Sequence, residues 1–207
     1  MVKSIAISGL AGSGSTTVAK LLSHKLEVSY FSAGQLWKDI SQGKLEEQHY
    51  SSLFEKLAKK YDLVIPSIAG ASKGSAAVSL WKTELGKNPK FHQVIEDLQQ
   101  ELANQGQIVI DGKLSIHMLK NADFRIWLLG SLDARASRTA QRDNISIEQA
   151  KNLLIEREEI HRKEWLRIYG FDYIEQEKEA DLVVDTSNKS PEKIVEEIIL
   201  NLSSRSS

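Results

Sequence analysis

A glycine-rich run near the amino terminus, GLAGSGST at residues 9–16, constrains this chain more than any other feature. The apolar run KSIAIS at residues 3–8 precedes it and predicts a strand, and the amphipathic segment 15–26 predicts a helix. Gly9, Gly12 and Gly14 would let successive backbone N–H groups converge on one anion, to which the helix adds its own unpaired N–H groups. This context favours a phosphate-binding loop over a turn that needs glycine for packing alone.

The loop departs from the usual pattern at one position. Ser15 stands where such loops normally carry a lysine that reaches the β- and γ-phosphates. Thr16 keeps the hydroxyl that would meet Mg²⁺. Without that lysine, backbone groups, Mg²⁺ and arginines from a lid have to stabilise the phosphates. We expect every residue of the loop to take part in binding a triphosphate: Gly9, Leu10, Ala11, Gly12, Ser13, Gly14, Ser15, Thr16 and Thr17.

Short apolar runs alternate with amphipathic segments along the rest of the chain. Further strands are predicted at 28–31, 107–112, 124–129 and 181–186, and further helices at 90–104, 132–142, 147–168 and 191–202. The last three of these apolar runs, at 107–112, 124–129 and 181–186, fit strands buried on both faces of a parallel sheet. The alternation predicts a three-layer α/β fold around such a sheet.

Two regions interrupt the alternation. Residues 35–105 are helical and polar, and their Gly/Ala/Ser-rich stretch at 65–79 is interpreted as a loop within a helical insertion, with a disordered linker as the alternative. Residues 143–170 are dense in charge and predict a helical hairpin or lid. We expect a single domain over residues 1–207 that contains both regions.

Composition excludes several classes of function. The chain has no cysteine, which excludes disulfides, zinc–thiolate sites and cysteine nucleophiles. Its net charge of −1 gives no sign of non-specific binding to nucleic acid or to membranes. The start MVKSIAISG lacks the apolar run of a signal peptide, and no window approaches the roughly 18 apolar residues of a membrane span. We therefore expect a cytoplasmic protein, a monomer, without nucleic-acid or membrane partners.

Four further blocks follow the loop in a recognisable order. The sequence reads GLAGSGSTTVAKLL with FSAGQLWK, then NPKFHQVIEDLQQELANQGQIVIDGKL, NADFRIWLLGSLDARASRTAQRDN and IEREEIHRKEWLRIYGFD. This ordered set resembles the archaeal-type cytidylate kinases and covers most of the chain outside 43–85. Members of that branch commonly have a hydroxyl residue at the position of Ser15.

The resemblance implies a P-loop nucleoside monophosphate kinase fold, with a helical insertion that binds the monophosphate and a mobile helical lid. It also implies a reaction in which the γ-phosphoryl group of ATP, with Mg²⁺, moves to a nucleoside monophosphate such as CMP or dCMP. Such chemistry requires that both phosphates are held in line, that their charge is neutralised and that water is excluded.

The resemblance gives roles to residues around the loop. Asp111 would orient Mg²⁺ together with Thr16, and Lys113 stands where the family usually has an arginine on the acceptor phosphate. Ser32 and Lys38 match positions that hold the monophosphate, again with lysine where arginine is usual. For Lys38 the alternative is an ordinary solvated helix lysine.

Arginines of the charged region complete the expected site. Arg157 matches the lid arginine of the family, and Arg162 would substitute for a second one at the position where this chain has Glu164. Arg138 and Arg142 lie on one predicted helix and are expected near ATP. The alternative for all of them is a charged helix surface.

The segment FHQVIEDLQQ departs furthest from the family. Leu98 occupies a position that carries an arginine for base recognition, and His92 is expected on the surface of a helix. These departures leave two alternatives to a CMP kinase. One is a P-loop kinase with a different small acceptor, and the other is a nucleotide-binding protein that has lost phosphoryl transfer and acts as a regulatory module.

Overall fold

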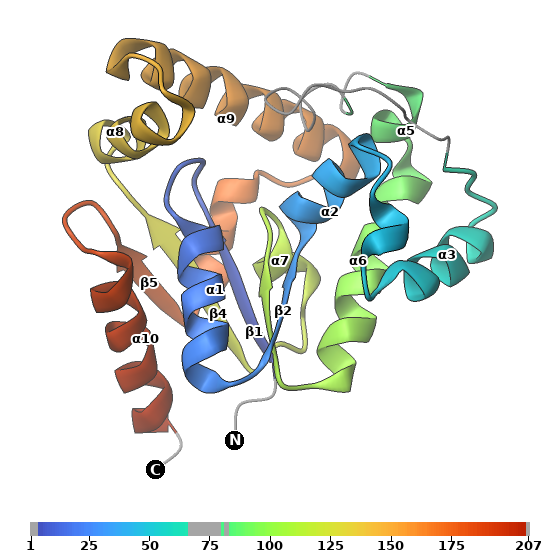
Figure 1. Cartoon of the computed structure of the whole chain (residues 1–207), viewed down its shortest axis with the longest axis horizontal. Helices are drawn as coiled ribbons and strands as arrows, with labels where there is room; N and C mark the ends of the chain where they lie inside the picture. Colours follow the sequence, from blue (N-terminus) through green and yellow to red (C-terminus); the bar gives the residue numbers. More distant parts are fainter. Residues whose placement is uncertain (1–3, 66–79, 81–82, 206–207) are drawn as a thin grey trace.

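A five-stranded parallel sheet forms the centre of the protein (Figure 1). The computed structural model describes residues 4–65, 80 and 83–205. In the sheet the strand order is β2-β3-β1-β4-β5, and every neighbouring pair is parallel. The strands are β1 Ser4–Gly9, β2 Ser29–Ser32, β3 Ile108–Asp111, β4 Phe124–Leu129 and β5 Leu182–Asp185. Each begins and ends within one residue of its predicted position, which confirms the predicted parallel α/β fold.

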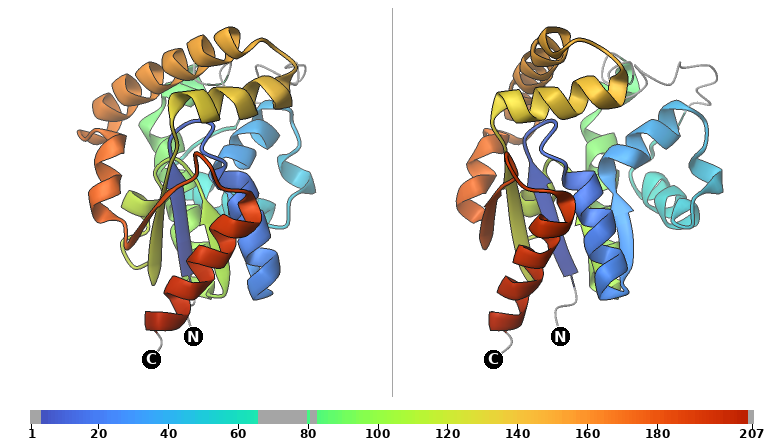
Figure 2. Two further views of the ribbon diagram at one scale, coloured as in Figure 1. Left: turned by 90° about the vertical axis from the view of Figure 1, so that its left-hand side faces the viewer. Right: turned by 60° about the vertical axis from the view of Figure 1, so that its left-hand side comes forward.

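Helices cover both faces of this sheet (Figures 1 and 2). They are α1 Ser15–Leu26, α2 Ala33–Ser41, α3 Ser51–Lys60, α5 Glu84–Lys87, α6 Pro89–Gln105, α7 Ser115–Met118, α8 Leu132–Asp143, α9 Ile147–Tyr169 and α10 Pro191–Arg205, with 3₁₀ turns η1 Leu45–Glu47 and η2 Tyr173–Glu179. Along β1 the side chains alternate, so that Ile5 and Ile7 pack with α1 and α10 while Ala6 packs with the cluster around α6 and α7. This alternation produces the three layers.

The expectation of strands buried on both faces holds for the centre of the sheet and is wrong for β5. Every residue of β1 and β3 is buried, whereas β5 exposes Val183. The reason is the position of β5 at the edge of the sheet, next to β4 alone.

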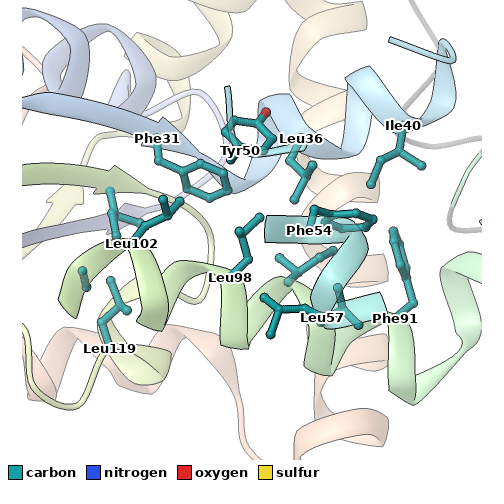
Figure 3. Close-up of a cluster of buried hydrophobic side chains, with 14 of the residues drawn as sticks. Phe31, Leu36, Ile40, Tyr50, Phe54, Leu57, Phe91, Leu98, Leu102 and Leu119 are labelled. Carbon is teal, nitrogen blue, oxygen red and sulfur yellow. The ribbon is translucent and has the colours of Figure 1, made fainter. Parts of the chain in front are cut away.

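The region 35–105 carries α2, α3, α5 and α6 beside the β2 edge (Figure 1). Most of its predicted Gly/Ala/Ser-rich loop, residues 66–79, lies outside the described residues. The helices share a core in which Leu98 of α6 packs with Phe31, Leu36 and Phe54 (Figure 3). Leu98 is fully buried, so its side chain is part of the core at the position where the resemblance implies an arginine for base recognition.

The predicted surface position of His92 is wrong. Its side chain is 4% exposed, lies beside the rings of Trp37, Phe91 and Tyr169, and has Nε2 2.9 Å from the carbonyl oxygen of Gly86. The face of α6 that carries His92 is therefore covered by α2, α5 and the end of α9, which sequence periodicity alone does not reveal.

The charged region forms a pair of helices, although not as predicted. Residues 143–170 contain one long helix, α9, and its hairpin partner is the preceding α8. Asn144 turns the chain with a left-handed φ of 54°, and Ser146 and Gln149 form a capping box at the start of α9. The two helices pass over the glycine loop at the carboxyl ends of the strands (Figures 1 and 2). Of the helices described, none is long and apolar enough to span a membrane.

Candidate functional site

The glycine loop joins the end of β1 to the start of α1, as predicted. Gly12 and Gly14 adopt left-handed φ values of 78° and 91°. In the described part of the chain no side chain caps the first turn of α1, and its first turn has no acidic residue. The N–H groups of that turn are therefore available to an anion. None of the described residues lies within 4 Å of a Cβ built on Gly14, so the loop is open there.

The loop is held closely on its other side. A Cβ on Gly9 would lie 2.5 Å from the carbonyl oxygen of Leu128, and one on Gly12 would lie 3.2 Å from Arg135. The N–H of Ser13 donates to the carbonyl oxygen of Leu10 at 3.1 Å. Strand β4 and helix α8 therefore fix the shape of the loop from behind.

Asp111 collects three hydroxyl donors at the end of β3. Its Oδ2 accepts hydrogen bonds from Thr16 Oγ1 at 2.8 Å, Ser32 Oγ at 3.0 Å and Tyr30 Oη at 3.3 Å. The strand register explains this meeting, because Asp111 lies opposite Ser32 on β2 and opposite Ile7 on β1, just before the loop. The structure thus joins the predicted magnesium residues Thr16 and Asp111 to Ser32, which was predicted on the acceptor side.

Tyr30 is a residue of this cluster that sequence reasoning missed. Burial and the neighbouring Asp111 charge raise the pKa of Tyr30, so its hydroxyl stays protonated and donates to the carboxylate. The available signal was strand alternation, which puts Tyr30 and Ser32 on the same side of β2.

The oxygen atoms of Asp111 and its neighbours are suitable ligands for Mg²⁺. Mg²⁺ prefers hard oxygen ligands and usually binds one or two carboxylates, several waters and the phosphates of its substrate. Asp111 and Thr16 offer a carboxylate and a hydroxyl beside the loop. Within the described ranges, no group of three His, Asp or Glu side chains could hold a metal by itself. A magnesium ion here would therefore depend on substrate phosphates.

Lys113 directs its ammonium group to the loop. Its Nζ donates to the carbonyl oxygen of Gly9. Burial lowers the pKa of Lys113 to about 8, against the opposing influence of the Asp111 and Glu158 carboxylates. Arg157 lies close enough to lower this pKa further.

Arg135 joins three parts of the site and was not predicted to belong to it. The residue is 5% exposed, and its Nη1 donates to the carbonyl oxygen of Ala11 in the loop at 2.8 Å and to Glu158 of α9. Its Nε donates to the carbonyl oxygen of Gly130 at 2.9 Å. The spacing of Arg135 from Arg138 was visible in the sequence, but its burial was not.

The predicted arginines have different surroundings. Arg138 Nη1 donates to Thr186 Oγ1 at 3.1 Å, and Thr186 Oγ1 donates to the carbonyl oxygen of Ser13 at 3.2 Å, so Arg138 lies next to the loop. Arg142 is exposed and pairs with the adjacent Asp143 at 2.6 Å. Arg162 is also exposed and pairs with Asp172 at 2.5 Å, so the structure does not bring it to the loop.

Lys38 and Arg157 approach the far end of α8. The pKa of Asp143 is lowered, first by the hydrogen bond from Arg142 and then by the charges of Arg157 and Lys38. Three cations, from α2, α8 and α9, therefore act electrostatically on one carboxylate, and of the three only Arg142 is hydrogen-bonded to it. Arg157 is half-buried, and burial lowers its pKa, followed by the charge of Arg142.

Known proteins are similar to this chain in sequence. The sequence model of the cytidylate kinase-like family matches residues 4–188. The chain is 33% identical to the cytidylate kinase of Pyrococcus horikoshii over 193 residues, covering 92% of this chain and 83% of that protein. It is 32% identical to the cytidylate kinase of Sulfolobus acidocaldarius over 202 residues, covering 97% and 94%.

Solved structures agree in fold at much lower identity. An uncharacterized protein from Eubacterium ventriosum superposes with a TM-score of 0.63 at 16% identity, covering 97% of this chain and 98% of that one. Shikimate kinase from Acinetobacter baumannii superposes with a TM-score of 0.55 at 15% identity, covering 99% and 95%. With a P-loop kinase fold, a glycine loop beside Asp111, and sequence similarity from end to end, the chain belongs to the cytidylate kinase-like family.

Proposed function

We propose that this protein is a nucleoside monophosphate kinase that transfers the γ-phosphoryl group of ATP to CMP or dCMP. One structural observation carries the proposal beyond family membership. The hydroxyl of Thr16, in the first turn of α1, donates a hydrogen bond to Asp111. Asp111 also accepts a hydrogen bond from Ser32, which belongs to the side of the site proposed to bind the acceptor. Donor and acceptor elements therefore meet at one carboxylate.

The donor side consists of the loop. Residues 9–17 would hold the triphosphate through backbone N–H groups and the amino end of α1. Arg138, which lies beside Ser13 through Thr186, and Arg142 at the end of α8 would bind ATP next to the loop. Thr16 and Asp111 would hold Mg²⁺, which supplies charge neutralisation on the phosphates when bound.

The acceptor side consists of α2, the end of β2 and the residues after β3. Ser32 at the start of α2 and Lys38 further along it would hold the monophosphate, with Lys113 between the two substrates. Arg157 approaches from α9 and would stabilise the charge that develops on the transferring group. Arg162 is paired with Asp172, so its predicted role requires that pair to open.

The two regions that interrupt the strand–helix alternation have parts in this proposal. Residues 35–105 would form the monophosphate-binding insertion and residues 143–170 the lid, within one domain spanning 1–207. Closure of the lid would exclude water from the γ-phosphate. We propose that the protein works as a monomer.

A coupled assay of ADP release tests the proposed reaction. The full-length protein is incubated with Mg·ATP and, in turn, CMP, dCMP, UMP, AMP, GMP and shikimate. We expect turnover with CMP or dCMP well above that with the other acceptors. Turnover with a different acceptor alone, or binding of Mg·ATP without any turnover, would contradict the proposal.

A further inference from the structure

A lysine ammonium lies at the glycine loop even though the loop itself has none. Ser15 occupies the position of the usual loop lysine, at the first residue of α1. Lys113 Nζ nevertheless donates to the carbonyl oxygen of Gly9, the residue with which the loop begins. The two residues are 104 positions apart, and they meet because β3 and β1 are neighbours in the sheet.

We propose that Lys113 supplies to the donor triphosphate the positive charge that Ser15 lacks, so that the loop cation comes from the neighbouring strand. The inference rests on the proposed function and deepens it. It assigns Lys113 chiefly to the phosphates of ATP, whereas the arginine usual at this position in the family contacts the acceptor phosphate.

The backbone at Lys113 is fixed against the loop strand. Gly112 donates its N–H to the carbonyl oxygen of Ile7 at 3.1 Å, and Ser8 Oγ donates to the carbonyl oxygen of Gly112 at 2.7 Å. Gln176 Nε2 donates to the carbonyl oxygen of Lys113 at 2.8 Å, and the Gln176 side chain is fully buried. Only the four-carbon side chain of Lys113 remains to adjust, and it starts from a backbone anchored beside β1.

The hydrogen-bond partner of the Lys113 ammonium group is an uncharged carbonyl oxygen, which favours binding of a phosphate. Arg135, a second cation at the loop, is paired with Glu158. Among the described residues no carboxylate lies within ion-pair distance of Lys113 Nζ, which bonds instead to the neutral Gly9 carbonyl. A phosphate oxygen could therefore join this ammonium without displacing a carboxylate, and would add the attraction between opposite charges.

Lysine chemistry suits this position. An ammonium group has three donors, so Nζ could keep its bond to Gly9 and still donate to phosphate oxygens. It is a compact charge on a flexible stem and can follow a phosphoryl group over a short distance, which the rigid guanidinium fork does less well. This accounts for a lysine at 113 in a chain with a serine at 15.

Binding measurements on charge-exchange variants test the assignment. Calorimetry with Mg²⁺ and a non-hydrolysable ATP analogue, and separately with CMP, is applied to the wild type, Lys113→Met, and Lys113→Met with Ser15→Lys. Loss of a charged hydrogen bond predicts analogue binding that is about 10- to 100-fold weaker in Lys113→Met, with CMP affinity changed by less than about 3-fold. The added Ser15→Lys change is expected to restore most of the analogue affinity.

Two further variants sharpen the result. Lys113→Gln keeps an N–H donor for Gly9 without the charge. It replaces Lys113→Met if circular dichroism shows that Lys113→Met is unfolded. Lys38→Met is the matched control and should weaken CMP rather than the analogue.

Loss of CMP affinity with unchanged analogue affinity in the Lys113 variants would overturn the assignment, and so would no change in either. A wild type that binds neither ligand would instead contradict the proposed function.

Discussion

Thr16 Oγ1 donates a hydrogen bond of 2.8 Å to Asp111 Oδ2, although the two residues are 95 positions apart. Thr16 lies in the first turn of the helix after the glycine loop, and Asp111 ends the adjacent strand β3. Because parallel strands end at the same edge of the sheet, this bond places a buried carboxylate beside the loop. The arrangement has consequences that can be measured.

Replacing Asp111 by Asn should remove most of the Mg²⁺-dependent activity. Asparagine keeps an oxygen that accepts from Thr16 and Ser32, so the fold should survive, but it loses the charge that attracts the metal. We expect a fall in kcat of about 100-fold or more, as for loss of a major electrostatic group. The measurement is initial rate against Mg²⁺ concentration.

The matched control is Asp123→Asn at the opposite end of the sheet, where Asp123 Oδ2 accepts from the N–H of Ser4 at 2.7 Å. It should lower the melting temperature without changing the response to Mg²⁺. Equal Mg²⁺ responses in both variants would show that Asp111 has no role at the metal.

Replacing Gly14 by Val should abolish binding of an ATP analogue. Gly14 has φ 91°, so any side chain there is strained by about 1–2 kcal/mol, and its Cβ would enter the open mouth of the loop. Gly170 offers a close match, with φ 75° and open space around a built Cβ, at the end of α9. Gly170→Val should destabilise the fold by a similar amount and leave analogue binding intact. Calorimetry and thermal melting separate the two effects, and retained binding in Gly14→Val would make the loop a structural turn only.

Breaking the ion pair between Arg135 and Glu158 should destabilise the protein strongly. Their side chains are 6% and 19% exposed, and Arg135 also binds the carbonyl oxygen of Ala11. Arg135→Met should lower the free energy of unfolding by about 3 kcal/mol, because the half-buried carboxylate of Glu158 is then left without its partner. Urea unfolding of both single variants and the double variant measures the coupling.

The double Arg135→Met, Glu158→Met variant should lose less than the sum of the singles. The exposed pair of Lys178 with Glu175 is the control, and Lys178→Met should have little effect. Additive losses at Arg135 and Glu158 would mean that the pair does not stabilise α9 over the loop.

His161 should make the protein less stable in mild acid. Burial, and then the charges of Lys113 and Arg157, lowers the pKa of His161 to about 3. The unfolded chain takes up a proton near pH 6.5 and the folded one does not, so stability is fully present above that pH and falls as the pH is lowered toward 3. Between pH 7.5 and 5.5 this one group should reduce the free energy of unfolding by about 1 kcal/mol.

The comparison is with His161→Phe, which keeps an aromatic ring against Trp165, 4.4 Å away between ring centres. Urea unfolding at the two pH values should give a smaller loss for the variant than for the wild type. Equal losses would place the acid sensitivity elsewhere in the chain.

Local patterns in the sequence predicted the strands, the loop, most helices and the family. Strand β4 and helix α1 begin and end where alternation and periodicity put them, because both patterns depend on neighbouring residues alone. The glycine loop was recognisable for the same reason, since its three glycines are contiguous with the strand and helix that give them meaning.

The tertiary structure decided which side chains reach the site. Arg135 and Arg162 look alike in the sequence, yet one is buried against the loop and the other is exposed beside Asp172. His92 and Leu98 are covered by helices that are distant along the chain. Each outcome depends on partners from other elements, which periodicity does not encode. The sequence by itself determined that a phosphate loop without its lysine exists, and only the packing of β3 against β1 brought the ammonium of Lys113 to the Gly9 carbonyl.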